Sequence, residues 1–314
     1  MTEFELIYKL INTQTVERSD VLTGIGDDCA VLAVPDGYSL AVSMDTLVSG
    51  VHFPDSASAF SVGYKSLAVN LSDLASTGAM PAWISLSLTM PVADENWIRE
   101  FVSGIFQLAS QYNVQLIGGD TCSGPLSISI QAHGFVKKPL LRSGARPDDL
   151  IYVSGHLGDS ALGLRAYKAE ENIAEGCLKR FNQPEPRIEL GLWLTQVATS
   201  CIDISDGLVS DLGHICEKSC CGADIQMASI PLSDEFKAYF NQQPDYITAI
   251  TFGDDYELCF TVNEQHSAAI DAYSNQSGLR LSCIGKIRSS GSVCFLDHDN
   301  KIITINNKGF EHFK

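Results

Sequence analysis

Aspartates recur in this chain beside short turns and at the ends of strand-like segments. The stretch GIGDDCAV, residues 24–31, is one example, and by itself it predicts a surface turn, because Gly and Asp both favour turns. Carboxylates that converge from several elements repel one another unless a positive charge lies among them. Mg²⁺ suits such a set, since it takes oxygen ligands and bridges carboxylates to substrate phosphates. The candidate carboxylates are Asp28, Asp45, Asp73, Asp120, Asp203, Asp206 and Asp254.

Motifs for other routes to phosphate chemistry are absent from the sequence. It contains no GxxxxGK[ST] loop and no protein-kinase glycine-rich loop with its HRD and DFG partners. The glycines of GHLGDS, residues 155–160, match neither dinucleotide fingerprint, so they indicate a simple turn. Phosphates would therefore bind through metal bridges and backbone amides rather than through a lysine. No Ser or Cys stands in a recognised nucleophile setting, and His52 taken alone is expected to be structural.

Periodic apolar residues predict the elements that must position these carboxylates. Alternation predicts strands over 38–46, ending at Asp45, over 84–90 and over 126–136, and a strand over 114–120 that runs into a glycine turn at Asp120. Helical spacing predicts helices over 59–79, which carries Asn70 and Asp73, and over 95–113, with Asp94 as N-cap. Further along, a strand, turn and helix are expected over 201–215, and a turn into a strand over 251–262. The turn-rich segment 142–149 interrupts this pattern, so we expect domains 1–147 and 148–314.

The composition narrows the class of protein. The chain has 314 residues, of which 45% are hydrophobic, enough for a substantial core. Its 38 acidic and 21 basic residues give a net charge of −17 without any Lys/Arg-rich block, which disfavours nucleic acid as a partner. The longest charge-free tract, residues 75–93, contains two prolines and a glycine, so no membrane span is expected. The N-terminus shows no signal-peptide features and the ten cysteines form no CxxC pair, so we expect a cytoplasmic protein with reduced thiols.

Six stretches taken together are specific: GIGDDCAV, SMDTLVSGVHF, AVNLSDLASTGAMP, LIGGDT, ISDGLVSDLGH and GDDYELCF. They resemble the thiamine-monophosphate kinase family, of the aminoimidazole-ribonucleotide synthetase superfamily, over nearly the whole chain. The resemblance implies direct in-line transfer of the γ-phosphoryl group of ATP to thiamine monophosphate, the last step of thiamine diphosphate biosynthesis. It implies several Mg²⁺ ions and no phosphoenzyme, in keeping with phosphoryl transfer as mostly positioning and charge stabilisation.

The resemblance also implies a fold. We expect a two-domain aminoimidazole-ribonucleotide-synthetase-like architecture, with an α/β N-terminal domain for metal binding, ATP binding and dimerisation. The C-terminal domain should be α+β. In a homodimer, the N-terminal sheets of the two copies would join into a barrel-like core, with ATP near that interface.

Roles follow residue by residue from the same resemblance. Met44 stands where the family often has Thr, so it can add only its carbonyl oxygen as a metal ligand. Asp254 stands where the family often has Glu, and its shorter side chain can turn a direct contact into a water-mediated one. Asp27 is expected to cap backbone amides in its turn. The implied metal ligands are Asp28, Ser43, Met44, Asp45, Asp73, Asp120, Asp203 and Asp206; ATP would contact Gly119, Asp120, Arg142 and Ser205; thiamine monophosphate would contact His52, Asp254 and Phe310.

Two alternatives remain open at the level of sequence. One is another ATP-using enzyme of the same superfamily, although a selenophosphate synthetase would want a reactive cysteine near the N-terminus and a hydrogenase-maturation relative a cysteine tail. Here the first cysteine is Cys29 and the chain ends FEHFK. The other is a non-catalytic acidic metal-binding protein, which would not need aspartates in so many separate settings. Phe310 also has a second interpretation, a side chain that packs the tail onto the C-terminal domain.

Overall fold

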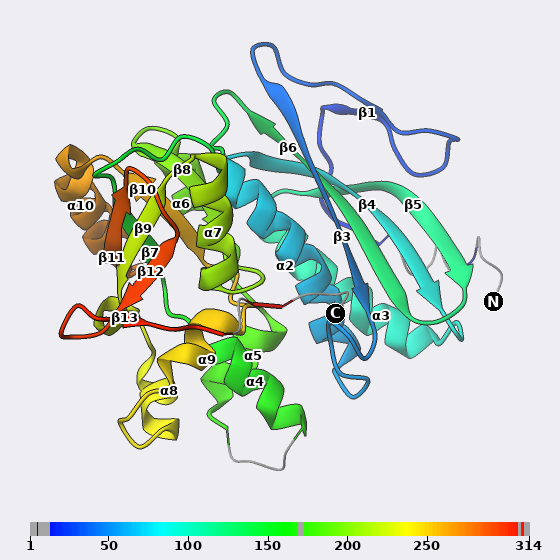
Figure 1. Ribbon diagram of the computed structural model, residues 1–314. Helices are drawn as coiled ribbons and strands as arrows, with labels where there is room; N and C mark the ends of the chain where they lie inside the picture. The colour runs from blue at the N-terminus through cyan, green and yellow to red at the C-terminus, as the bar shows by residue number, and fades with distance from the viewer. Residues whose placement is uncertain (1–4, 6–12, 169–172, 307–308, 311–314) are drawn as a thin grey trace. The chain divides into compact units, whose positions relative to one another are not determined.

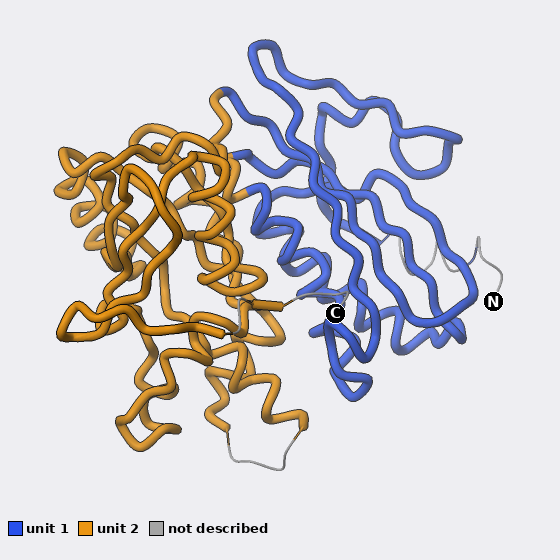
Figure 2. Tube along the Cα trace, in the orientation of Figure 1, with its two compact units in different colours: residues 1–74, 79–137 blue, residues 75–78, 138–314 orange. Residues whose placement is uncertain are grey.

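The computed structural model describes residue 5 and residues 13–168, 173–306 and 309–310. The chain divides into two compact units (Figure 2). The first unit contains residues 1–74 and 79–137, and the second contains residues 75–78 and 138–314.

The first unit is built on a four-stranded sheet with the strand order β3-β6-β4-β5 (Figure 1). β4 and β5 run parallel, and the other two pairs are antiparallel. β1 and β2 form a separate two-stranded sheet. The elements of this unit are β1 (Val21–Thr23), β2 (Val31–Leu32), β3 (Ser39–Val48), α2 (Ala59–Thr77), β4 (Met80–Met90), α3 (Glu95–Gln111), β5 (Gln115–Ser123) and β6 (Ser127–Val136).

Alternation along β4 separates a buried face from an open face. Ile84, Leu86 and Leu88 are each at most 3% exposed, whereas Ser87 between them is exposed. This confirms the strand predicted from the alternating pattern, and β6 and α2 likewise match their predicted ranges closely. The predicted cap of α3 is also confirmed, because the Asp94 carboxylate accepts backbone amides in the first turn of that helix.

Two predicted strand ends are wrong. β3 does not stop at Asp45 but continues to Val48, because its last three residues keep pairing with β6. β5 runs through Gly118 and Gly119 where a glycine turn was predicted, because these residues keep pairing in parallel with β4. A side chain at Gly119 would overlap the backbone of Leu86, so the glycine permits close approach of two strands rather than a turn.

The second unit is built on a seven-stranded mixed sheet with the order β13-β12-β9-β11-β7-β10-β8. Only β9 and β12 run parallel in it. Its strands are β7 (Leu150–Ser154), β8 (Ala198–Asp203), β9 (Gly222–Gln226), β10 (Leu258–Val262), β11 (Leu281–Arg288), β12 (Val293–Leu296) and β13 (Ile302–Ile303). Its helices are α4 (Asp159–Lys168), α5 (Glu175–Asn182), α6 (Ile188–Leu194), α7 (Leu208–Lys218), α8 (Asp234–Tyr239), α9 (Tyr246–Thr251) and α10 (Ser267–Ser277), with short 3₁₀ turns η2 (Met227–Ser229) and η3 (Glu264–His266).

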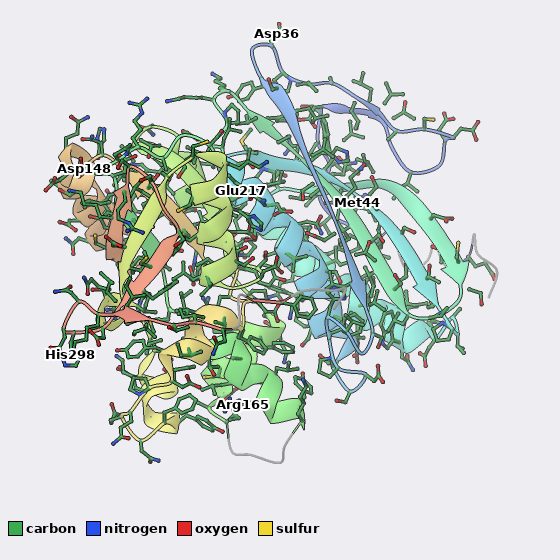
Figure 3. The ribbon with its side chains drawn as sticks, viewed as in Figure 1. Asp36, Met44, Asp148, Arg165, Glu217 and His298 are labelled. Atoms are coloured by element: carbon green, nitrogen blue, oxygen red, sulfur yellow. The ribbon has the colours of Figure 1, made fainter. Side chains whose placement is uncertain are left out.

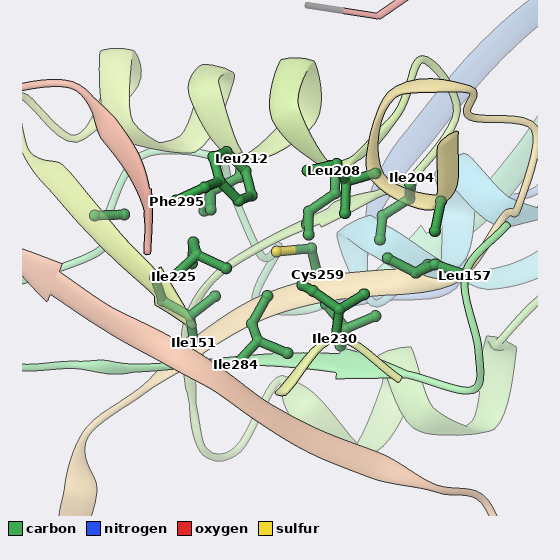
Figure 4. Close-up of a cluster of buried hydrophobic side chains, with 14 of the residues drawn as sticks. Ile151, Leu157, Ile204, Leu208, Leu212, Ile225, Ile230, Cys259, Ile284 and Phe295 are labelled. Carbon is green, nitrogen blue, oxygen red and sulfur yellow. The ribbon is translucent and has the colours of Figure 1, made fainter. Parts of the chain in front are cut away.

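The core of the second unit lies between α7 and the sheet (Figure 4). Leu208 and Leu212 of α7 point toward the strands, where they meet Cys259 of β10 and Ile225 of β9. All four side chains are fully buried, and such burial contributes about 1.5–3 kcal/mol for each large aliphatic side chain. This packing fixes the start of α7, and with it the turn that joins β8 to α7.

Two expectations concern the chain as a whole. Among the residues that the structure describes, no helix is long and apolar enough to cross a membrane. The ten cysteines all lie in the described part of the chain, and each is a free thiol.

Candidate active site

In the first unit, β3 and α2 bring four of the polar side chains together. Ser43 and Asp45 lie on β3, and Asn70 and Asp73 lie on α2. The Ser43 hydroxyl donates to Asp73 Oδ2, and Asn70 Oδ1 accepts from the backbone amide of Asp45 at 3.2 Å. Asn70 is fully buried, and its Nδ2 donates to the carbonyl of Ser66 at 3.0 Å, which fixes the orientation of its amide. The two acids are therefore held close together by a pair of strand-to-helix contacts.

The electrostatics of this pair suit a hard cation. Burial, and then the neighbouring charge of Asp73, raise the pKa of Asp45 to about 7. Two carboxylates that oppose each other's ionisation in this way favour a positive charge between them. The side-chain atoms of Ser43, Asp45 and Asp73 that could bind a metal ion here are all oxygens, the ligand type that Mg²⁺ prefers. The residues present therefore fit a divalent cation at Asp45 and Asp73.

Of three more predicted residues of this unit, Met44 lies on β3, His52 follows that strand, and Asp28 lies in the turn between β1 and β2. The backbone amide of Val48 donates to His52 Nδ1 at 3.0 Å, so the neutral ring carries its proton on Nε2. Met44 lies on β3 (Figure 3) and is 59% exposed. Asp28 is exposed in its turn, and its backbone amide donates to the Asp27 carboxylate at 2.8 Å. The expected capping role of Asp27 is thus confirmed.

Gly119 and Asp120 lie on the far edge strand of the same sheet. Residues that pair across the four strands form a row that runs from one edge of the sheet to the other. Asp45 shares its row with Ile130, Leu86 and Gly119. Asp120 belongs to the next row, with Ser87, Ser129 and Thr46. Adjacent rows point to opposite faces, and three strand spacings separate the two edges by about 14 Å. Within one copy of the chain, the structure therefore does not bring Asp120 to Asp45.

In the second unit, the turn after β8 is organised by a carboxylate that sequence reasoning missed. The backbone amides of Ser205, Asp206 and Gly207 donate to Asp211 Oδ2 at 3.0, 3.1 and 3.1 Å. Burial and the nearby Asp206 raise the pKa of Asp211 to about 7, although the amide donors oppose that rise. An acid in the first turn of a helix that follows a glycine is the signal that could have identified it.

Three segments of the second unit meet at this turn. The amide of Asp254 donates to the carbonyl of Ser205 at 2.7 Å, and the amide of Phe310 donates to the carbonyl of Asp206 at 3.1 Å. Asp203, at the end of β8, is 3% exposed, while the Phe310 side chain is 44% exposed. The structure therefore gathers five predicted site residues of this unit, which are Asp203, Ser205, Asp206, Asp254 and Phe310.

Arg142, another predicted residue of the second unit, lies in a different loop. Arg142 is exposed in the loop before β7, and its carbonyl accepts from the Ser219 hydroxyl at 3.0 Å. Among the described residues, no group of three or more His, Cys, Asp or Glu side chains is close enough to hold a metal ion. The assignments of single residues to metal, ATP or substrate therefore stay predictions.

Comparison with known proteins shows the family of this chain. The AIR synthase related protein family matches through its N-terminal domain at residues 26–136 and its C-terminal domain at residues 146–296. The thiamine-monophosphate kinase of Escherichia coli K12 is 45% identical over 319 residues, covering 99% of this chain and 98% of its own. The chain belongs to the thiamine-monophosphate kinase family. As a member it is an enzyme of the kinase class in thiamine biosynthesis, so the two alternatives left open by the sequence are excluded.

Solved structures of the thiamine-monophosphate kinase family share the fold. The crystal structure of the enzyme from Stenotrophomonas maltophilia K279a matches with a TM-score of 0.88 and 41% identity, covering 96% of this chain and 98% of that one. AaThiL complexed with AMPPCP and TMP matches with a TM-score of 0.80 and 29% identity, covering 90% and 89%. The expected two-domain fold is confirmed by these matches, and its sheets are mixed.

Proposed function

We propose that this chain transfers the γ-phosphoryl group of ATP to thiamine monophosphate and releases ADP and thiamine diphosphate. The observation that carries the proposal is the AaThiL complex, in which a protein of this fold, 29% identical, binds AMPPCP, an ATP analogue, together with TMP. Transfer is direct and in-line, as one displacement. This path is supported by the sequence, in which no Ser, Cys or His stands in a recognised activated-nucleophile setting.

The metal ligands in this proposal are oxygen atoms of aspartates, of Ser43 and of Met44. Asp45 and Asp73 supply a pair of carboxylates that interact electrostatically, and the Ser43 hydroxyl donates to Asp73. Mg²⁺ ions held there would supply positive charge to neutralise the phosphates of the substrates. The full proposed set is Asp28, Ser43, the carbonyl of Met44, Asp45, Asp73, Asp120, Asp203 and Asp206.

The substrate contacts are proposed from the family resemblance. ATP contacts Gly119, Asp120, Arg142 and Ser205. Thiamine monophosphate contacts His52, Asp254 and Phe310, and the exposed ring of Phe310 offers an apolar surface for the thiamine rings. These contacts position the acceptor phosphate for attack, and positioning is most of what catalyses phosphoryl transfer.

The chain is proposed to act as a homodimer. β3 is an edge strand of its sheet and exposes Leu40, Val42 and Met44 by 43%, 52% and 59%. An exposed apolar edge strand is typical of a surface that another chain covers. If a second copy closes a barrel by placing its β5 edge beside this β3 edge, its own Asp120 lies about one strand spacing from β3 instead of three, on the face opposite to the Asp45 side chain. The proposed dimer thus shortens the separation of these two residues along the sheet.

A coupled assay of ADP release tests the function. ADP should form from ATP and Mg²⁺ only when thiamine monophosphate is present, and thiamine diphosphate should form in equal amount. ADP release at the same rate with and without thiamine monophosphate would contradict the proposal. Unphosphorylated thiamine serves as the matched control, because it keeps the rings and lacks the accepting phosphate.

A further inference from the structure

Asp255, the second aspartate of the GDDYE loop, is buried against the start of α4. It is 5% exposed. The backbone amide of Gly158 lies 3.0 and 3.2 Å from its two carboxyl oxygens, and the Ser160 hydroxyl oxygen lies 2.9 Å from Oδ1. Gly158 of the GHLGDS turn therefore holds a carboxyl group of the chain itself.

Ser160 also contacts Gly253, at the start of the GDDYE loop. Its hydroxyl oxygen lies 2.7 Å from the carbonyl of Gly253 as well as 2.9 Å from Asp255. A hydroxyl has one proton to donate. Both contacts are satisfied together when Ser160 donates to Gly253 and a protonated Asp255 donates to Ser160. Burial raises the pKa of Asp255 well above its ordinary value, which agrees with a neutral acid.

The backbone between these anchors is one that ordinary side chains rarely adopt. Asp254 and Tyr256 have φ values of 61° and 51°, and Gly253 has φ 81°. Such left-handed residues persist only where their surroundings hold them. Asp255 and Glu257 point inward, and Glu257 accepts from Ser154 and from two arginines. The inward residues thus hold Asp254 in its left-handed conformation against Ser205.

We propose that Asp255, held by Gly158 and Ser160, is a positioning residue that fixes Asp254 for thiamine monophosphate. The inference rests on the proposed function, because it takes Asp254 as a contact of that substrate. It assigns to the GHLGDS turn the role of holding the substrate loop, and not that of binding a nucleotide. A neutral acid at this position also means that an amide can replace it.

Steady-state kinetics on four variants test this role. Asp255→Ala should raise KM for thiamine monophosphate by about tenfold or more, since small misplacements are costly, and should leave KM for ATP within about twofold. Ser160→Ala should act in the same direction and more weakly. Asp255→Asn should stay near wild type, because its amide accepts from Gly158 and donates to Ser160. Asp254→Ala should raise KM for thiamine monophosphate at least as much as Asp255→Ala.

A buried aspartate elsewhere in the second unit provides the control. Asp149 is 1% exposed and accepts from the Arg146 amide at 2.9 Å and the Thr199 hydroxyl at 2.7 Å. Asp149→Ala should lower the melting temperature without changing the ratio of the two KM values. If Asp255→Ala does not fold, Asp255→Asn and Ser160→Ala decide the question alone.

The outcomes separate this inference from the proposed function. If Asp254→Ala raises KM for thiamine monophosphate and the Asp255→Ala and Ser160→Ala variants do not, the positioning role is wrong and the substrate contact stands. Equal losses in Asp255→Asn and Asp255→Ala, or equal rises in both KM values, would also overturn it. If Asp254→Ala changes neither KM, the substrate contact fails and the positioning role fails with it.

Discussion

At the scale of single residues, Asp73 and Asp94 are two aspartates of the first unit with different surroundings. Asp94 accepts the amides of Asn96 and Trp97 at 2.8 and 3.0 Å, which makes it a helix cap worth about 1 kcal/mol. Asp73 accepts from Ser43 and raises the pKa of Asp45. We expect Asp73→Asn to lower kcat/KM by more than about hundredfold, as for loss of a metal ligand. Asp94→Asn should leave kcat/KM near wild type in the same assay, and equal losses at equal folded fraction would count against the metal role of Asp73.

Phe310 gives a second prediction at this scale. Phe310 is 44% exposed, and its backbone amide donates to the Asp206 carbonyl at 3.1 Å, so a backbone contact holds Phe310 at this turn. Stacked aromatic pairs contribute about 0.5–1.5 kcal/mol beyond buried area. Phe310→Ala should therefore weaken thiamine monophosphate binding by about tenfold and leave ATP binding unchanged, as titration calorimetry can measure. A large fall in melting temperature with unchanged affinity would instead support a purely structural tail.

At the scale of elements, Glu257 at the start of β10 joins α5 and α6 to the sheet. It is fully buried and accepts from Arg180, from Ser154 at 2.6 Å and from Arg187 at 2.7 and 2.6 Å. Breaking a buried ion pair costs about 3–5 kcal/mol because the remaining charges are left without a partner. Glu257→Gln should lower the free energy of unfolding by that amount in urea titrations. Glu95→Gln, which breaks an exposed pair with Arg99, is the matched control and should have a far smaller effect.

The same carboxylate predicts a dependence of stability on pH. Burial alone would raise the pKa of Glu257, but the charges and hydrogen bonds of Arg187 and Arg180 outweigh it and lower the pKa from 4.5 to about 2. Its contribution to stability is therefore present above pH 4.5 and is lost as the pH falls toward 2. Between these values, Glu257→Gln should lose less stability with falling pH than wild type. If the free energy of unfolding changed with pH in the same way in Glu257→Gln and in wild type, Glu257 would not be the source of this pH dependence.

At the scale of elements, local sequence signals were sufficient to predict several strands and helices. Alternation predicted β4 and β6, and the cap at Asp94 predicted the start of α3, because these signals are local. The glycines at 118 and 119 predicted a turn, but pairing with β4 overrode that local preference. The sequence placed Asp203, Asp206 and Asp254 at strand ends or turns, whereas the anchors Asp211 and Asp255 act through contacts that depend on tertiary structure.

At the scale of the whole molecule, the proposed dimer makes a prediction about mixed assemblies. If Asp73 and Asp120 of one site come from different copies, a dimer of one Asp73→Asn and one Asp120→Asn subunit has one site with neither substitution. Co-expression of the two inactive variants should then restore about a quarter of wild-type activity, given random pairing. Each variant expressed alone is the control. Failure to recover activity in isolated mixed dimers would show that both residues serve the site from one copy.

The central claim is that one phosphoryl group passes from ATP to thiamine monophosphate, and following a label tests it most directly. ATP labelled in the γ-phosphoryl group would be incubated with Mg²⁺, thiamine monophosphate and the enzyme, and the products would be separated. The account predicts that the label appears in thiamine diphosphate in equal amount to ADP, and that excess chelator abolishes the transfer. Label found only in inorganic phosphate, or transfer that persists in excess chelator, would contradict it.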